Sequence, residues 1–221
     1  MGVMTLQNFR DDLKDALGRP NVDANRLDRW INNSLYEFGY AFKFPELQKV
    51  GTIATVAGQR SYDMPADFRA LTDDGVRIIT PQDRFGGILV NETRTNYLRS
   101  DRYDLSNNRG VVGAYHLFQK KLWVRPSPDG TATSIEFDYW SKLTKLTNPA
   151  DVTIFDEDWD EILFRGALYR GHIAYGEHDR VQNIYNLFLG AVRSRVMAED
   201  LQEFPEGGIS AIQSAYDAQI R

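Results

Sequence analysis

The chain has 221 residues, enough for one sizeable hydrophobic core or two small ones. Of these residues 42% are hydrophobic and 26% are charged, as in an ordinary soluble globular protein. The formal net charge of -5 argues against a general nucleic-acid binder, which usually carries a basic excess, but it allows a protein that lets DNA pass.

The sequence lacks cysteine, which excludes disulfide bonds, zinc sites built on thiolates and cysteine catalysis. The first residues carry no basic stretch followed by an apolar core, so no signal peptide is visible. No apolar run approaches the roughly 20 residues that a membrane span needs. We therefore expect a soluble protein that is made in the cytoplasm and has no membrane partner.

Two amphipathic helices are predicted at the start of the chain. Thr5 can cap the first helix, and Gly18 followed by Pro20 ends it. Asp23 can cap the second helix, and Pro45 marks its end. Their apolar stripes are formed by Leu6, Phe9, Leu13, Ala16 and Leu17 in the first helix and by Leu27, Trp30, Ile31, Ser34, Leu35, Phe38 and Phe42 in the second.

The middle of the chain changes to the pattern of short strands. Ala57-Gly58 is a predicted hairpin turn between the first two strands, and residues 126–130 form a turn before the last one. The predicted strands are residues 48–56, 59–64, 75–80, 88–90, 114–119, 121–125 and 133–140.

A helical hairpin is predicted over residues 155–201, and the first two helices are expected to pack on it. Gly176 is placed to end its first helix, and Asp179 is placed to cap its second. Acidic residues crowd the N-terminus of the first helix, while Arg193 and Arg195 lie near the C-terminus of the second, and both placements suit the helix macrodipole. The apolar stripes are Trp159, Ile162, Leu163, Leu168, Tyr169 and Ile173, then Val181, Ile184, Tyr185, Phe188, Leu189, Val192 and Val196.

Runs of strands between runs of helices predict an α+β fold. We expect a mainly α-helical bundle of about four long helices, with a β-rich insertion between the second and third helices and an extended C-terminal tail. In residue numbers, 1–47 and 153–203 form the bundle, 48–152 the insertion and 204–221 the tail.

Ionisable residues offer two candidate sites for chemistry. The acidic run at residues 156–161 could supply paired carboxylates or bind a metal, but the sequence favours a role in complementing the helix dipole, because nothing selects two carboxylates facing one cleft. His172 and His178 are six residues apart, unlike the four-residue spacing of zinc ligands on a helix, and His116 lies alone in a predicted strand. Structural roles are therefore favoured for all three histidines.

Motifs of other enzyme classes are missing from the sequence. There is no Gly-x-Ser-x-Gly nucleophile elbow and no glycine-rich phosphate loop. We therefore predict no enzyme activity, no metal site and no cofactor.

Basic and aromatic residues alternate in the predicted strands at residues 114–125. Lys120, Lys121 and Arg125 flank Phe118 and Trp123, which could stack bases as a reader of single strands does. Because the whole chain is acidic, the sequence favours a solvated strand face with the aromatic side chains in the core beneath it.

Two polar or flexible segments remain. Residues 99–110 are expected to form an exposed loop that either orders on contact with a partner or stays disordered. The C-terminal segment follows a Gly-Gly joint and carries Ile209, Ile212, Tyr216 and Ile220 on one side, too short a segment to fold alone. It either packs back on its own domain or docks into a groove of a partner.

A set of short motifs in a fixed order resembles a known family. The motifs are Trp30-Ile31-Asn32-Asn33-Ser34, Phe44-Pro45-Glu46-Leu47, the stretch from Ala57-Gly58-Gln59 through Tyr62-Asp63-Met64-Pro65 to Asp67-Phe68, Tyr115, Leu122-Trp123-Val124-Arg125-Pro126-Ser127-Pro128, and the helical pair at 159–197. Through their order in a chain of this size, the sequence resembles the head–tail adaptor (connector) proteins of tailed bacteriophages, over residues 5–200.

The resemblance implies a structural protein of the virion, located in the neck between the capsid portal and the tail. Such adaptors form a homo-oligomeric ring, a dodecamer, beneath the portal protein and above a tail or nozzle protein, and DNA passes through the channel without specific binding. Their C-terminal segment hooks into the portal, which here implies Phe204, Ile209, Ile212, Tyr216 and Ile220 as portal contacts. Their loops face the tail, which here implies Arg99, Asp101, Arg102, Tyr103, Asn107 and Asn108 as tail-side residues.

Two other functions stay open. The protein could be another neck or tail-completion protein, lower in the assembly. It could also be a cell-wall hydrolase that uses Glu157, Asp158 or Glu161, since some adaptors of short-tailed phages are linked to wall hydrolysis, although no matching catalytic constellation is visible.

Overall fold

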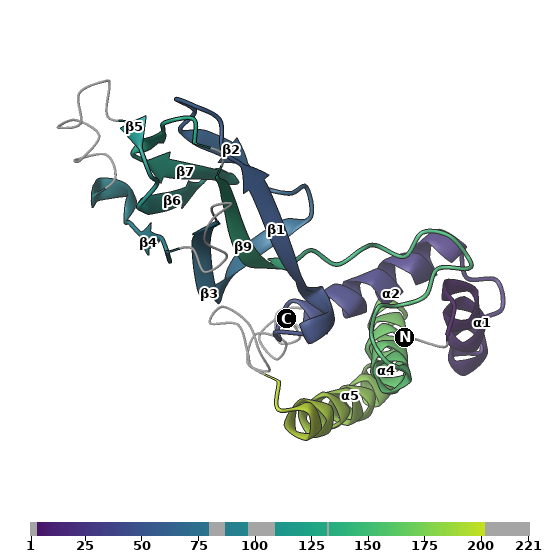
Figure 1. Ribbon diagram of the computed structural model, residues 1–221. Helices are drawn as coiled ribbons and strands as arrows, with labels where there is room; N and C mark the ends of the chain where they lie inside the picture. Colours follow the sequence, from purple (N-terminus) through teal and green to yellow (C-terminus); the bar gives the residue numbers. More distant parts are fainter. Residues whose placement is uncertain (1–3, 80–86, 97–108, 132, 202–221) are drawn as a thin grey trace. The chain divides into compact units, whose positions relative to one another are not determined.

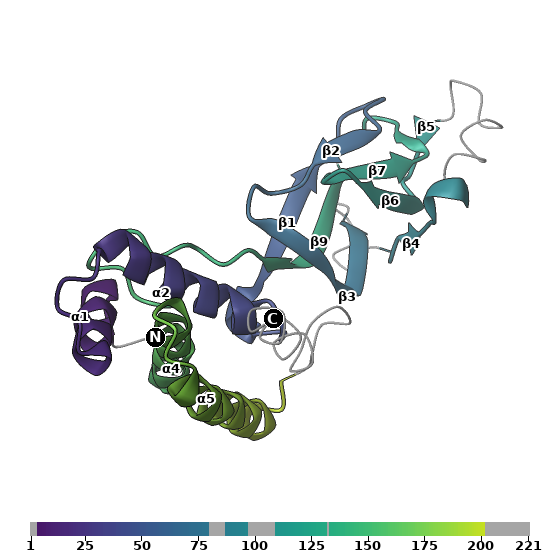
Figure 2. The same cartoon turned by 180° about the vertical axis from the view of Figure 1, so that it is seen from behind.

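The computed structural model describes residues 4–79, 87–96, 109–131 and 133–201, without the side chains of Asp73, Asp74 and His178. The chain divides into two compact units. The helical unit comprises residues 1–46 and 143–221, and the strand unit comprises residues 47–142 (Figures 1 and 2).

The helical unit is built around one central helix, α4. This helix packs against each of the other three, and in both ribbon views it lies between α1 and α5 (Figures 1 and 2). The helices are α1 (Leu6–Leu17), α2 (Ala24–Gly39), α4 (Glu157–Ala174) and α5 (His178–Glu199).

Several predicted helix ends are confirmed, but α2 ends at Gly39 and does not continue to the predicted stop at Pro45. The Thr5 hydroxyl accepts a hydrogen bond from the Asn8 backbone N–H at 3.2 Å, and Gly18 ends α1 in the left-handed conformation. Asp23 stands at the start of α2 but makes no capping hydrogen bond through its side chain. The prediction that Asp179 caps α5 is wrong, because the chain already enters that helix at His178 after Glu177.

The apolar stripes predicted for the four helices form the core of the helical unit. Leu13, Phe38 and Phe188 are fully buried, as expected for residues at three- and four-residue steps on one helix face. Ala16 is exposed and is the exception in the first stripe.

A buried asparagine ties the segment before α4 to the helices. The Asn32 amide donates to the Leu146 carbonyl at 3.0 Å and accepts from the Leu146 backbone N–H at 2.8 Å. The pair satisfies backbone groups that the connector would otherwise bury without partners.

The strand unit contains three sheets in its described residues, with strand orders β1-β9-β3, β2-β7-β6-β4 and β5-β8. The first two are antiparallel apart from the parallel pair β4–β6. The strands are β1 (Gln48–Ala54), β2 (Ser61–Asp63), β3 (Phe68–Ile79), β4 (Val90–Asn91), β5 (Arg109–Gly110), β6 (Ala114–Phe118), β7 (Lys121–Arg125), β8 (Ser127–Pro128) and β9 (Ser134–Ser141).

Two expectations for the strands are wrong. The turn at Ala57-Gly58 exists, but β1 pairs with β9 and β2 pairs with β7, so the flanking strands do not form a hairpin with each other. The strand predicted at residues 75–80 begins much earlier, at Phe68. The pairing of β3 with β9 shifts register between Leu71 and Val76. This irregularity interrupts the alternation of inward- and outward-facing residues that would have revealed the first half of β3.

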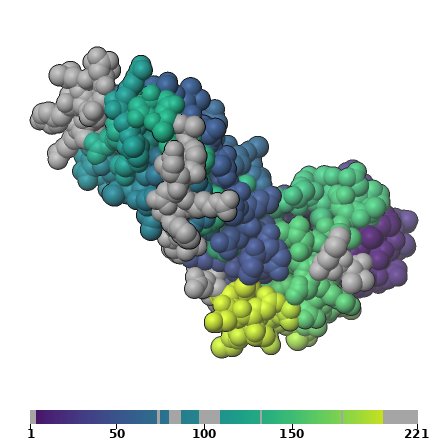
Figure 3. All heavy atoms as spheres, viewed as in Figure 1, coloured from purple at the N-terminus to yellow at the C-terminus, as the bar shows by residue number. Residues whose placement is uncertain are grey.

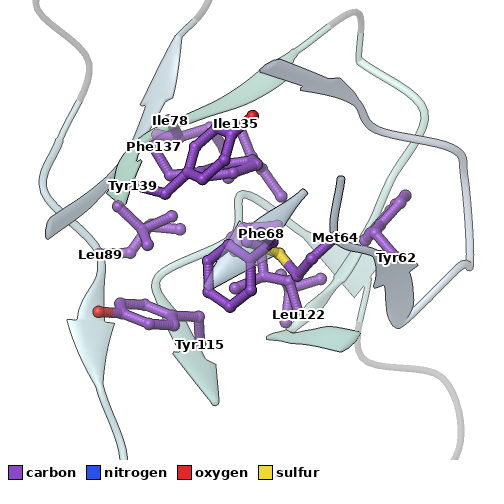
Figure 4. Packing of buried hydrophobic residues seen from close by; sticks show 13 residues of the cluster. Tyr62, Met64, Phe68, Ile78, Leu89, Tyr115, Leu122, Ile135, Phe137 and Tyr139 are labelled. Atoms are coloured by element: carbon purple, nitrogen blue, oxygen red, sulfur yellow. The ribbon is translucent and has the colours of Figure 1, made fainter. Parts of the chain in front are cut away.

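The strand unit has its own hydrophobic core. Phe137 and Ile135 from the three-stranded sheet point toward Leu122 and Tyr115 from the four-stranded sheet, with Phe68 among them (Figure 4). Gly51 lets β1 pass over the Phe137 ring, because a β-carbon at this glycine would stand 2.4 Å from the ring.

The expected fold class is wrong. The described part of the chain has about 27% strand in several sheets and is a β-rich fold, not a bundle of four long helices with a single β insertion. Most strand segments are short, although β3 has 12 residues and β9 has 8. Pairing between strands far apart, such as β1 with β9, assembles these segments into sheets that enclose a separate core.

Candidate interaction surfaces

The acidic run at the start of α4 is bound to the end of α5 by one arginine. The Arg195 guanidinium lies 3.1 Å from the Asp156 carboxylate and 2.6 Å from that of Asp158, and it also pairs with Glu199. Glu161 pairs with Arg165 at 2.8 Å, one helical turn away. Asp156 and Asp158 therefore join the start of α4 to the end of α5, whereas the ion pair of Glu161 lies within α4.

A shallow groove of about 290 Å³ runs beside these ion pairs. Its lining combines the carboxylates of Asp158 and Glu161 with the guanidinium groups of Arg165 and Arg195. Glu157, the third residue considered for hydrolysis, is exposed at the first turn of α4 and does not line the groove. The other lining residues are Ile162, Ala191, Ser194 and Ala198, so charged side chains share the groove with apolar and small ones.

Two of the three histidines have structural partners. His172 is buried, and its Nδ1 lies 2.7 Å from the Glu177 carboxylate, which also pairs with Arg19 at 3.2 Å. The hydrogen bond with His172, followed by that with Arg19, holds the pKa of Glu177 below its ordinary value. His116 Nδ1 lies 2.9 Å from the Glu92 carbonyl, and the side chain of His178 lies outside the described part. In the described ranges no group of three or more acidic or histidine side chains is placed to hold a metal ion.

A buried charged network joins α2 and α4. The Arg170 guanidinium lies 2.5 Å from the Glu37 carboxylate, and the two side chains keep 12% and 6% of their exposure to solvent. The Tyr169 hydroxyl donates to the same carboxylate at 3.2 Å, and burial is the main cause that raises the pKa of Tyr169. This network connects α2 to α4 within the helical unit.

The aromatic residues Phe118 of β6 and Trp123 of β7 do not lie in the core, where the sequence predicted them. Leu122 and Val124 belong to the core, so Trp123, between them on β7, lies on the opposite face of the sheet. Trp123 pairs across the strands with His116, and the Arg94 guanidinium lies 4.1 Å from the centre of the Phe118 ring. The prediction that Phe118 and Trp123 lie in the core beneath a solvated face is therefore wrong. The flanking Arg125 pairs with Glu92 and Lys121 pairs with Asp63, so acidic neighbours offset two of the basic groups.

The candidate partner contacts of the C-terminal tail and of the long loop lie outside the described residues. They are Phe204, Ile209, Ile212, Tyr216 and Ile220 in the tail, and Arg99, Asp101, Arg102, Tyr103, Asn107 and Asn108 in the loop. Their roles stay predictions.

Comparison with known protein families identifies the chain. The model of the SU10 adaptor protein family matches residues 4–209, nearly the whole length. The chain belongs to the SU10 adaptor protein family. The match confirms the resemblance to phage head–tail adaptors, and it makes the chain a structural bacteriophage protein and a virion component. No curated protein matches this sequence.

An SU10 adaptor interacts with other virion proteins, so its exposed apolar residues are candidate contact residues. Helix α5 carries two of them, Leu187 at 52% exposure and Met197 at 83%. The C-terminal turns of α5, yellow in Figure 3, lie open at the surface in that view. Leu187 and Met197 fall outside the main apolar stripe of the helix, so the periodicity of the sequence does not reveal this face. No helix in the described ranges is long and apolar enough to cross a membrane.

Proposed function

We propose that this SU10 adaptor forms a ring, a dodecamer, beneath the portal in the neck of the virion. The ring joins the capsid to the tail and continues the DNA channel without binding DNA specifically. The family match over residues 4–209 carries this proposal, because it covers both the helical unit and the strand unit.

The acidic balance of the chain supports a channel role. With a net charge of -5, the ring walls would repel the phosphate backbone on average, so passing DNA would not be held by counterion release.

We further propose that residues 204–221 dock into the portal through Phe204, Ile209, Ile212, Tyr216 and Ile220, and that the loop at residues 99–108 meets the tail or nozzle protein. A short docking segment binds weakly by itself. Its repetition around a ring supplies avidity without a large individual interface.

Electron microscopy of the full chain mixed with the portal protein of its virus tests this function. We expect a ring stacked on the portal, and we expect a variant lacking residues 210–221 to stay folded and fail to join it. A truncated protein that still assembles on the portal would show that the tail is not the anchor.

Localisation in the virion separates the adaptor from its alternatives. Labelled protein at the tail tip would favour a tail-completion role over the neck. Wall-degrading activity that is lost in Glu161→Gln, with folding intact, would support a hydrolase.

A further inference from the structure

The outward face of α5 differs from an ordinary solvated helix surface. Among the described residues from 181 to 198, Arg193 is the only exposed charged side chain, and it lies between the exposed residues Leu187 and Met197. The remaining exposed residues there are amides, small residues or serine. Depletion of charge together with exposed methionine and arginine is typical of the centre of a protein interface.

Gly190 lies in the middle of the same face, and the structure of the single chain gives no reason for a glycine at this position. A β-carbon at this position would have no heavy atom within 4 Å, and the backbone does not adopt a positive φ there. Glycine weakens a helix interior, so its presence without an internal reason suggests the close approach of another backbone.

Helix α1, on the other side of α4, presents the complementary charge. Asp12 and Asp15 are exposed on it and have no ion-pair partner in the part of the chain that the structure describes. Arg193 on α5 likewise has no ion-pair partner among the described residues. The small side chain of Ala16, exposed one turn from Asp12, leaves room for an apolar contact.

The two faces also match in length. Leu187 and Met197 are ten positions apart, a rise of about 15 Å along α5, and the 12 residues of α1 rise by about 18 Å. The faces belong to different helices of one unit, so a contact between copies would join two unlike surfaces. Such head-to-tail contacts close into rings when the rotation between copies allows it.

We propose that the α5 face around Gly190 docks on the acidic face of α1 in a second copy of this chain, with Arg193 placed between Asp12 and Asp15. This contact rests on the proposed ring, in which the α5 face of one copy would meet the α1 face of the next.

Engineered disulfides test the pairing directly, because the chain has no cysteine of its own. Full-length Asp12→Cys and Gly190→Cys proteins are oxidised separately, as a mixture, and as a double variant with both changes in one chain. We expect a covalent dimer from the mixture and a ladder of higher oligomers from the double variant. Asn33→Cys on α2, which is also exposed, replaces Asp12→Cys as the control and is expected to give no cross-link with Gly190→Cys.

Charge reversal gives a second measurement. Arg193→Asp should reduce the cross-linked fraction of the double variant at least tenfold. Combining it with Asp12→Arg and Asp15→Arg in a cysteine-free chain should restore rings in electron micrographs.

Three other outcomes would contradict the proposed contact, and they can be told apart. A dimer from Gly190→Cys alone would show that α5 pairs with itself. Rings of wild-type protein without cross-links in the double variant would overturn the α5–α1 contact and leave the ring intact. Absence of rings and of cross-links, both alone and on the portal, would overturn the ring and this contact together.

Discussion

Gly166 on α4 lies against Ser34 on α2 so closely that a β-carbon at position 166 would stand 1.9 Å from the Ser34 Oγ and 3.0 Å from the Phe188 ring. The two helices therefore cross where both carry small residues. Gly166→Ala should destabilise the protein by about 2 kcal/mol, since the cost of overpacking exceeds the gain in helix propensity. Urea unfolding followed by circular dichroism measures the change.

The Ser34 hydroxyl is buried and has no hydrogen-bond partner among the described residues. Ser34→Ala should therefore be neutral or stabilise by about 1 kcal/mol, because it removes a desolvated polar group. In the Ser34→Ala background, Gly166→Ala should cost roughly half as much, and a double-mutant cycle measures this coupling. Strict additivity of the two changes would show that the hydroxyl is not what the new methyl group meets.

Gly190 provides the matched control on α5. Its position is open, so Gly190→Ala should stabilise the isolated chain by about 0.5–1 kcal/mol through helix propensity alone. If the neighbouring copy packs there, the same change should also lower the fraction of ring in electron micrographs. A gain in stability without any loss of rings would argue against close packing at this glycine.

The ion pair between Arg170 and Glu37 is largely buried. Arg170→Met should destabilise by about 3 kcal/mol, because it leaves the Glu37 carboxylate buried without its cationic partner. The double variant Arg170→Met/Glu37→Met should recover most of that loss. Equal unfolding free energies for the single and double variants would show that the unpaired carboxylate is not the cause.

Glu177 links folding to pH. Its pKa is lowered from the ordinary value of 4.5, mainly by the hydrogen bond with His172, so the unfolded chain takes up a proton at a higher pH than the folded one. The stabilisation is present above pH 4.5 and is lost as the pH falls below that value. Unfolding midpoints recorded from about pH 6 down to about pH 3 should fall less steeply for Glu177→Gln, whereas parallel curves would refute the link.

The turn between β6 and β7 places Gln119 and Lys120 at φ values of 52° and 60°. A two-residue turn of this geometry favours Asn-Gly, because positive φ strains residues with a β-carbon. Gln119→Asn/Lys120→Gly should therefore stabilise the strand unit by about 1 kcal/mol, as measured by tryptophan fluorescence during unfolding. No gain would mean that neighbouring contacts of Gln119 or Lys120 offset the strain.

Local patterns in the sequence are enough to place the helices and to indicate the family. Helix stripes such as Leu27, Ile31, Leu35 and Phe38 repeat within a few residues, so their periodicity can be read without knowledge of distant contacts. The order of the short motifs, from Trp30-Ile31 to Pro126-Ser127-Pro128, is a property of the chain alone, and it correctly indicated a phage adaptor.

Packing between distant parts of the chain is what sets the strand pairing, the contacts of the charged residues and the open faces. Nothing local tells β1 to pair with β9, whose partner residues lie at least 80 positions further along. Such pairing depends on loop closure and on a shared core, and not on the strand next in sequence. Nor does the sequence show that Arg195 would pair with both Asp156 and Asp158, or that Met197 would stay exposed. Exposure is a property of what the rest of the chain leaves uncovered, and it is known only once the helices have packed.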